Sequence, residues 1–362
     1  MGFSLQSAYG WCTSRPRALL TRDIVLSDDG SAGGHRRLER IALMAQRMAS
    51  WGLLLPTREV VMAQGPPDLT KIIDLAELAE GLGFDSVWVG DSILARPRLE
   101  ALTTLAAVAA RTRQVKLGTA VLLSALRHPV LLANEAANVD ILSNGRLILG
   151  LGVATKNPTI EREFAACGVP FRRRLGIFEE GVEIMRRLWT DPQVTFQGRH
   201  FQLTDVSLGL RPVQPGGIPL WLAGGVDAAM RRMLRLGDGW FPNPSSPRAF
   251  ADAWARVQTL GREMGRDVSG LHRCVYTTLN INADVAQAER ELRAFVEGYY
   301  NAPYEVMMRA QGLCAGTAEA CARWLRDFAL AGAQTVVIRF GSPDQVGQLQ
   351  RCAREVLPQV RA

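Results

Sequence analysis

Residues 114–156 decide the fold of this chain, and they read QVKLGTAVLLSALRHPVLLANEAANVDILSNGRLILGLGVATK. Residues 115–122 and 147–153 are short apolar runs, each with glycine inside it, and both have the length of a buried strand. Residues 130–142 between them carry apolar side chains at helical spacing. The stretch therefore predicts a strand, a helix and a second strand.

Both ends of the predicted helix carry recognisable signals. His128-Pro129 opens it, because a proline in the first turn gives up no intrahelical hydrogen bond. Asn144-Gly145 ends it, as residues that tolerate a left-handed backbone commonly do. We read His128 as a structural hydrogen-bonding residue rather than a catalytic one. Two parallel strands joined by one helix form a βαβ unit with a right-handed crossover.

The same alternation of strand and helix repeats along the rest of the chain. Repeated βαβ units favour a closed parallel barrel over an open sheet, so we predict one α/β domain over residues 49–362. It is a single (β/α)8, or TIM-barrel, fold with insertions after strands four and seven. The expected strands are 51–55, 85–89, 115–122, 147–153, 219–223, 239–241, 272–281 and 335–340.

The connections between these strands include three unusual segments. Residues 157–173, after strand four, read as a long irregular loop, which in a compact domain is usually functional. Residues 194–203 read as a small hairpin, and residues 285–310, after strand seven, as a helical insertion. The last helix is expected over residues 343–356.

Composition narrows the class of protein. The chain has 362 residues, 48% of them hydrophobic, and no apolar run of about 18 residues, so we expect no membrane association. Its six cysteines include no CxxC pair and its four histidines are isolated, so we expect no metal site and reduced thiols in a cytoplasmic protein.

The net charge of +7 does not indicate a nucleic-acid partner. Only Lys71, Lys116 and Lys156 are lysines among the 42 basic residues, and such a skew reflects base composition rather than a binding surface. The arginine clusters are short and lack interleaved aromatic residues, so nucleic-acid binding is not expected.

Residues 1–48 differ from the rest of the chain. They are rich in Ser, Arg, Asp and Gly and have weak hydrophobic periodicity, so we expect a largely disordered N-terminal extension. A targeting arm, or translation that starts at Met44 or Met48, are the alternatives.

The strand ends are poor in acid–base groups, although a barrel carries its chemistry there. Asp91 is the one carboxylate directly at a strand end, and Glu59 lies a few residues past another. Neither paired carboxylates nor a Ser-His-Asp set can be assembled, which indicates that a cofactor supplies the chemistry.

Two pairs of glycines at strand ends are candidate cofactor sites. Gly224-Gly225 lies between strand five and its helix, where backbone N–H groups can bind a phosphate, and a plain tight turn is an equal alternative. Residues 150–152 read GLG but lack the third glycine of a dinucleotide fingerprint. The aromatic pair Trp240-Phe241 can form the wall of a pocket, and the alternative is that both side chains belong only to the hydrophobic core.

Taken together, five stretches resemble the bacterial luciferase-like monooxygenase family of flavin- and deazaflavin-dependent oxidoreductases. The stretches occur in family order and cover about residues 50–358; they are GFDSVWVGDS (83–92), KLGTAVLL and LRHPVLLA (116–133), LSNGRLILGLGVA (142–154), FEEGVEIMRRLWT (178–190) and IPLWLAGG with GDGWFPN (218–243).

The resemblance implies a flat redox ring at the carboxyl ends of the strands. It places a non-proline cis peptide at Ala120-Val121, behind the ring, and puts Asp91 and Ser92 near the reactive face as the catalytic candidates. It also favours the phosphate interpretation of Gly224-Gly225. The predicted cofactor-binding residues are Thr119, Ala120, Val121, Gly152, Thr155, Ala223, Gly224, Gly225 and Trp240.

The chain also departs from known members of the family. The deazaflavin sugar-phosphate dehydrogenases carry His and Glu where this chain has Ser92 and Thr155, which argues against their acid–base mechanism. Luciferase has an arginine for the flavin phosphate near the position of Val153, so the light-emitting reaction is not supported either.

From these observations we predict a monooxygenase that uses reduced FMN, supplied by a separate flavin reductase, and O2 to oxidise a small organic substrate. The substrate is expected to pass over Thr57 and the two insertions. An anionic group on it would meet Arg96, Arg98 or Arg339, and membership of a surface ion pair is an equal alternative for each of these arginines. The alternatives are hydride transfer with the deazaflavin coenzyme F-420 and a flavin-binding protein without turnover. The oligomeric state stays open, with a homodimer compatible with the resemblance.

Overall fold

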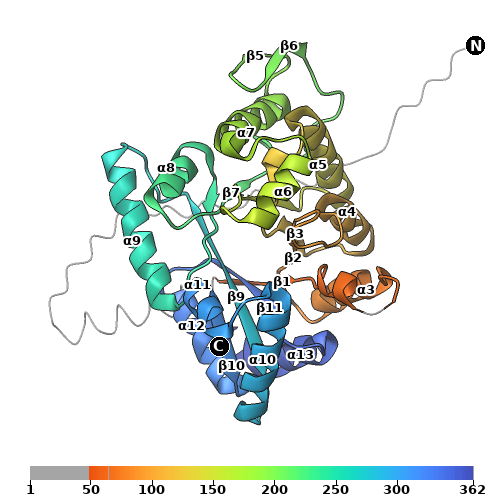
Figure 1. Cartoon of the computed structure of the whole chain (residues 1–362), viewed down its shortest axis with the longest axis vertical. Helices are drawn as coiled ribbons and strands as arrows, with labels where there is room; N and C mark the ends of the chain where they lie inside the picture. Colours follow the sequence, from red (N-terminus) through yellow and green to blue (C-terminus); the bar gives the residue numbers. More distant parts are fainter. Residues whose placement is uncertain (1–48, 64, 362) are drawn as a thin grey trace, which may run out of the picture. The chain divides into compact units, whose positions relative to one another are not determined.

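The computed structural model describes residues 49–63 and 65–361, so the predicted N-terminal extension lies outside the described residues. In this part of the chain eight parallel strands close into a ring, as predicted (Figure 1). The order around the ring is β1 (Ser50–Leu54), β2 (Ser86–Val89), β3 (Lys116–Thr119), β4 (Leu147–Leu151), β7 (Leu220–Leu222), β8 (Gly239–Trp240), β9 (His272–Ile281) and β11 (Thr335–Phe340). Pairing of β11 with β1 closes the barrel, with Ser50 opposite Thr335.

Helices cover the outside of the ring between successive strands. The stretch 114–156 forms β3, α5 and β4 as expected, with His128 accepting a hydrogen bond from Val130 N at the helix start and Asn144 left-handed at its end. The helices of the outer layer are α3 (Thr70–Gly81), α4 (Ala101–Arg111), α5 (Pro129–Ser143), α7 (Arg174–Thr190), α8 (Asp227–Leu236), α9 (Pro247–Glu263), α12 (Ala318–Leu330), α13 (Gln345–Arg351) and α14 (Leu357–Arg361).

The insertion after β4 is more ordered than the sequence suggested. Residues 157–173 were expected to be an irregular loop, but α6 (Pro158–Ala166) and a 3-10 turn (Phe171–Arg173) occupy most of it. The start of the helix has a signal that can be read in the sequence: Asn157 accepts a hydrogen bond from Thr159 N, and Pro158 follows as the first helical residue.

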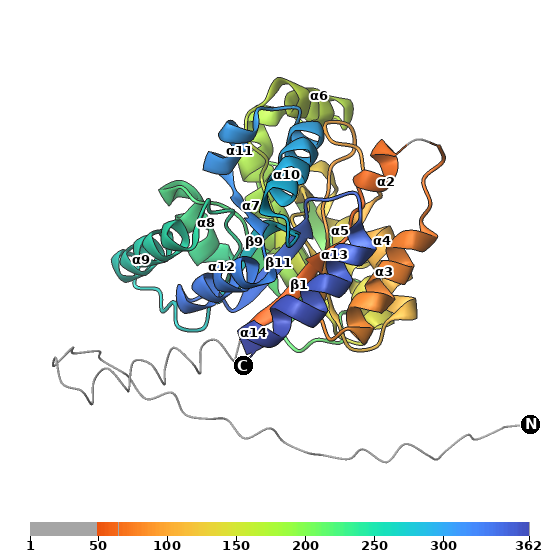
Figure 2. The same cartoon turned by 90° about the horizontal axis from the view of Figure 1, so that it is seen from below.

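The other insertions largely follow the predictions. The hairpin consists of β5 (Val194–Gln197) and β6 (Gln202–Val206), and residues 285–310 form α10 (Val285–Tyr300) and α11 (Tyr304–Ala310). An unexpected strand, β10 (Gly312–Gly316), pairs in parallel with the second half of β9. Figure 2 shows α6, α10, α11 and the short helix α2 (Glu59–Met62) gathered over one end of the barrel.

The core has two layers, one between strands and helices and one inside the ring. Trp88 and Trp221 fill the inside, with ring centroids 5.4 Å apart. Gly118 makes room for Trp88, because a Cβ there would lie 2.1 Å from the indole. Because the two tryptophans fill the inside of the ring, the open space lies at the carboxyl ends of the strands.

Candidate active site

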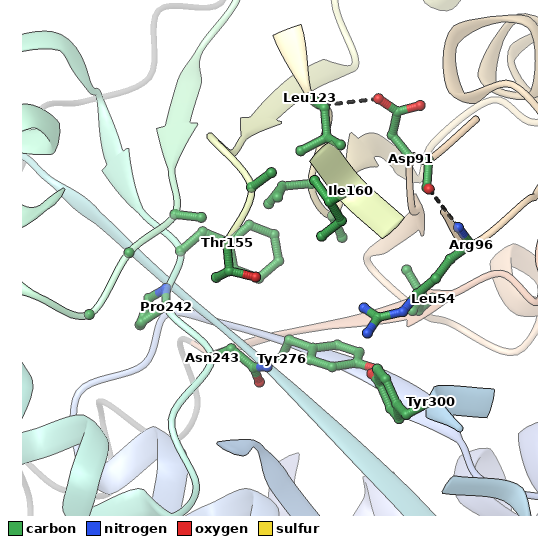
Figure 3. Close-up of a pocket in the computed structure, with 18 of the residues that line it drawn as sticks. Leu54, Asp91, Arg96, Leu123, Thr155, Ile160, Pro242, Asn243, Tyr276 and Tyr300 are labelled. Carbon is green, nitrogen blue, oxygen red and sulfur yellow. Dashed lines mark hydrogen bonds between the residues drawn. The ribbon is translucent and has the colours of Figure 1, made fainter. Parts of the chain in front are cut away.

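A cavity of about 580 Å³ opens at the carboxyl ends of the barrel strands, above the buried tryptophans (Figure 3). Its walls come from segments that are far apart in the sequence but meet because parallel strands all end at the same rim. The residues that line the cavity include Asp91, Ser92, Arg96, Arg98, Ala120, Val121, Thr155, Ile160, Glu163, Ala223, Gly224, Gly225, Tyr276, Tyr299 and Tyr300.

One wall consists of small apolar side chains after β3. The peptide bond between Ala120 and Val121 is cis, as the family resemblance implied, and both residues line the cavity. Thr119 lies behind them, fully buried, with its hydroxyl donating to Gly150 O at 2.8 Å. Gly152 also lies behind, since a Cβ there would be 2.5 Å from Val121 Cγ2. Thr119 and Gly152 therefore support this wall without lining it.

The turn between β7 and α8 forms the adjoining wall, with Ala223, Gly224 and Gly225 all on the cavity. Gly224 has a φ of +141°, and a Cβ there would lie 2.3 Å from Ala229 Cβ, so this position requires glycine. A Cβ on Gly225 would meet no atom within 4 Å. The turn therefore exposes backbone to the cavity at the start of a helix, which is the arrangement that binds phosphate.

Trp240 does not form a wall of the cavity, contrary to the prediction. Its indole is fully buried on the outer side of the barrel, stacked on Phe250 at 5.3 Å. Its Nε1 donates to Gly224 O at 2.9 Å, so it holds the glycine turn from behind. The neighbouring Phe241 lines the cavity instead, because successive residues of a strand face opposite sides.

Asp91 is committed to a structural ion pair. Its side chain is 3% exposed and contacts the Arg127 guanidinium at 2.7 Å and 3.0 Å, while Leu123 N donates to it at 2.9 Å. Burial alone would lower the pKa of Arg127, but the hydrogen bonds and charge of Asp91 raise it. The carboxylate therefore ties the loop after β2 to the loop after β3.

Ser92, the second predicted catalytic residue, is held in a similar way. Its hydroxyl donates to Glu163 Oε1 at 2.9 Å, and the same oxygen accepts from Ile93 N and Leu94 N. Glu163 comes from α6 and is fully buried, and its other carboxylate oxygen has no partner in the described part of the chain. The expectation of an irregular loop over residues 157–173 gives no sign of this contact, because it depends on α6.

The opposite wall is cationic and aromatic. Arg96 and Arg98 line it, as expected for the binding of an anionic group, and the Arg96 guanidinium lies over the Tyr300 ring at 5.0 Å. Figure 3 shows Arg96 and the side chains of Tyr276 and Tyr300 converging on the same side of the cavity. Neither tyrosine was predicted; Tyr276 comes from β9 and Tyr300 from the last turn of α10.

Arg339 lies behind this wall rather than on its surface. It is 1% exposed, donates from Nε to Thr278 Oγ1 and from Nη1 to the Tyr300 hydroxyl, both at 3.2 Å, and leaves Nη2 without a partner. Four aromatic rings surround it, those of Tyr276, Phe295, Tyr299 and Tyr300, at 4.4–5.4 Å. The prediction that Arg339 meets a substrate directly therefore does not fit its position.

The pKa values of the ionisable groups around Arg339 are shifted in different directions. Burial raises the pKa of Tyr300, but the charge of Arg339 and local hydrogen bonds outweigh burial and lower the net pKa. Burial raises the pKa of Tyr276 well above the usual value of a phenol. Burial also raises the pKa of Glu59, against the opposing charge of Arg339. Tyr300 is thus the phenol of this wall that ionises most readily.

The expected path of the substrate is only partly reflected in the structure. Thr57 is 1% exposed and does not line the cavity, so the predicted passage of the substrate over Thr57 does not fit its position. Both insertions do reach the cavity: Ile160 and Glu163 come from α6, and Tyr299 and Tyr300 from α10.

A family comparison agrees with this architecture. The model of the luciferase-like monooxygenase family matches residues 50–349, so the chain belongs to that family. Its members related to this chain are oxidoreductases, and the fold and general class predicted from the sequence are confirmed.

Several curated relatives are named F-420-dependent glucose-6-phosphate dehydrogenases. The protein from Amycolatopsis mediterranei is 37% identical over 186 residues, 49% of this chain and 53% of the relative, so this match spans about half of the relative's length. The protein from Intrasporangium calvum is 29% identical over 323 residues, 80% of this chain and 95% of the relative.

Solved structures share the barrel at low sequence identity. An F-420-dependent secondary alcohol dehydrogenase superposes with a TM-score of 0.73 at 22% identity, covering 87% of this chain and 99% of that one. A monooxygenase from Streptomyces bottropensis gives a TM-score of 0.72 at 23% identity, covering 85% and 99%. Because an F-420-dependent dehydrogenase and a monooxygenase share this barrel, the likeness in fold does not choose between these two kinds of reaction.

None of the helices in the described residues has the length and apolar character needed to cross a bilayer.

Proposed function

We propose that this protein is an oxidoreductase that transfers a hydride between coenzyme F-420 and a small substrate. The observation that carries this proposal is the similarity to F-420-dependent dehydrogenases, which in one case extends over 95% of the relative's length. It replaces the FMN-dependent monooxygenase favoured by the sequence, since the relatives support the deazaflavin alternative better than FMN.

The cavity fits a deazaflavin on two structural grounds. Ala120 and Val121 present a wall of small side chains against which a flat ring can lie. Gly224, where a Cβ has no room, and Gly225 expose backbone at the start of α8 for a phosphate. When bound there, the deazaflavin accepts or donates a hydride. The protein would orient the ring and the substrate and exclude water.

The cationic wall suggests what kind of substrate is bound. The side chains of Arg96 and Arg98 form no ion pair with any carboxylate of residues 49–63 and 65–361, whereas Arg127 close by is paired with Asp91 and Glu100. A carboxylate or phosphate on the substrate would supply the missing partner. We expect Arg96→Gln to raise KM for an anionic substrate about tenfold. Arg248→Gln is the control, because Arg248 belongs to an exposed ion pair and does not line the cavity.

Binding and turnover measured with both cofactors test the proposed reaction. The purified chain is titrated with F-420 and with FMN, and then assayed for F-420 reduction with a panel of neutral, carboxylated and phosphorylated alcohols. We expect tight binding of F-420 and its reduction by at least one anionic alcohol. Oxygen consumption with reduced FMN and a flavin reductase, together with no turnover of F-420, would overturn the proposal.

FMN-dependent monooxygenation is the second candidate, because of one specific feature of the site. By the family resemblance, Ser92 and Thr155 stand where the sugar-phosphate dehydrogenases carry His and Glu. The Ser92 hydroxyl is engaged by Glu163. Hydride transfer to or from an alcohol needs a group that takes or gives the hydroxyl proton. If the chain had no such group, a reaction driven by O2 would fit better.

A further inference from the structure

Tyr300 and Arg339 form a pair that can take up or release the hydroxyl proton of an alcohol substrate. Tyr300 lines the cavity, while Arg339 is buried behind it and donates to its hydroxyl at 3.2 Å. The pair joins the last turn of α10 in the insertion to β11 of the barrel. Tyr300 therefore brings a hydroxyl that can exchange a proton to the cavity. It comes from α10, and not from the strand ends at Ser92 and Thr155 where the family resemblance places His and Glu.

The charge of Arg339 is balanced by a carboxylate only at a distance, by Glu59, and this is what makes the pair unusual. Its guanidinium forms no ion pair with any carboxylate among the described residues, and its Nη2 has no hydrogen-bond partner. A buried cation without a counter-ion is costly, and aromatic faces compensate only part of that cost. A phenolate at Tyr300 would provide the missing negative charge within hydrogen-bonding distance.

Gln311 allows Tyr300 to exist with and without its proton. In the neutral state the Tyr300 hydroxyl donates to Gln311 Oε1 at 3.0 Å, while the buried Gln311 Nε2 has no hydrogen-bond partner within residues 49–63 and 65–361. Rotation of the amide by half a turn would direct the N–H group of Gln311 at a phenolate oxygen. Both protonation states can therefore be satisfied by a movement of one side-chain amide.

The groups facing the Tyr300 hydroxyl set the direction of its ionisation. Arg339 and Arg96 contribute positive charge, and Tyr276 and Tyr299 are phenols whose own pKa values are raised by burial. Glu59 is the acidic group in this neighbourhood, and burial raises its pKa also. The local balance of charge therefore favours a negative oxygen on Tyr300.

We propose that Tyr300 is the residue that exchanges the substrate's hydroxyl proton in the reaction proposed above, with Arg339 as its positioning residue. In the oxidising direction the Tyr300 phenolate would remove the proton from the substrate O–H as the adjacent C–H gives up its hydride, for which a bound deazaflavin would be the acceptor. The C–O single bond would become a carbonyl and Tyr300 would gain the proton. In the reducing direction the phenol returns it.

Titration of tyrosine absorbance in the chain without cofactor tests this assignment independently of turnover. We expect one phenol to ionise before the others, and Tyr300→Phe to abolish that early transition. Tyr304→Phe is the matched control, because Tyr304 also lies against an arginine, Arg293 at 4.6 Å, but outside the cavity. It should leave the early transition unchanged. An early transition that persists in Tyr300→Phe would overturn the proposal, as would its absence from the unmodified chain.

Kinetics with F-420 then separate a proton-transfer role from a structural one. Tyr300→Phe should lower kcat about 100-fold or more, with KM little changed, and remove the basic-group limb of the pH profile. Thermal unfolding of both variants checks that they are folded. A Tyr300→Phe enzyme with unaltered kcat and pH profile would refute the role of Tyr300. Early ionisation of Tyr300 without any turnover of F-420 would refute the proposed reaction while leaving the ionisable pair established.

Discussion

Two buried arginines at opposite ends of the barrel show how the same side chain serves different purposes. Arg146, at the amino end of β4, makes five hydrogen bonds from its guanidinium, to Ser143 O, Thr112 Oγ1, Val115 O, Ala109 O and Thr112 O. Arg339, near the carboxyl end of β11, makes two and leaves one nitrogen unpartnered. The difference indicates that the amino end is built for stability and that the carboxyl end retains unsatisfied groups for ligands and chemistry.

The largest expected effect is on stability at the amino end. Arg146→Ala would leave several buried carbonyl oxygens without donors, so we expect the free energy of unfolding to fall by roughly 3–5 kcal/mol. Chemical denaturation measures it. Arg113→Ala is the control, since Arg113 bonds nearby carbonyls from an exposed position and should cost below about 1 kcal/mol. Equal losses in the two variants would contradict the comparison.

His272, also at the amino end, should make stability depend on pH. Burial, and secondarily the charge of Arg273, lowers its pKa from 6.5 to about 4, and its ring stacks on Trp221 at 4.2 Å. Below the unfolded pKa the unfolded chain binds the proton first, so stability is full above pH 6.5 and is lost progressively towards pH 4.

Over that range the loss from His272 amounts to about 3 kcal/mol. Unfolding of the protein and of His272→Gln, measured at several pH values, isolates this contribution. The variant should be less stable at neutral pH but should show a flatter pH dependence. Parallel pH curves for the two proteins would show that His272 is not the cause.

Arg339→Met should lower activity and leave stability almost unchanged, whereas Arg146→Ala should lower stability. Replacing a buried cation that lacks an ion-pair partner among the described residues by an apolar side chain of similar length is expected to change the free energy of unfolding by less than about 1 kcal/mol. Turnover should nevertheless fall about 100-fold, because Tyr300 loses its charged partner. Denaturation and steady-state kinetics on one preparation test both expectations. A loss of stability comparable to that of Arg146→Ala would remove the distinction between the two ends.

A smaller effect is expected at the glycine turn of the cavity. Gly224→Ala forces a side chain onto a backbone with φ of +141° and against Ala229, at a cost of about 1–3 kcal/mol. If the turn rearranges to relieve this, affinity for F-420 should fall roughly tenfold to a hundredfold. Gly225→Ala, which has open space, is the matched control. Fluorescence titration measures both affinities, and equal values would argue against the phosphate assignment.

The sequence by itself determined the barrel, because its evidence is local. Strand and helix periodicity, the caps of α5 and the order of the family stretches each lie within a short segment. The family resemblance of these short segments located Ala120 and Val121, and the same resemblance favoured the phosphate interpretation of the glycine turn at the end of a strand.

Tertiary structure alone decided which side chains meet above the barrel. Asp91 looked catalytic as the one carboxylate at a strand end, but its pairing with Arg127 depends on how two loops pack. Tyr300 and Arg339 are 39 residues apart, and the sequence of α10 does not indicate which of its faces turns towards β11. Long-range packing and burial set these contacts and the pKa of each group, and neither quantity is encoded in any one segment.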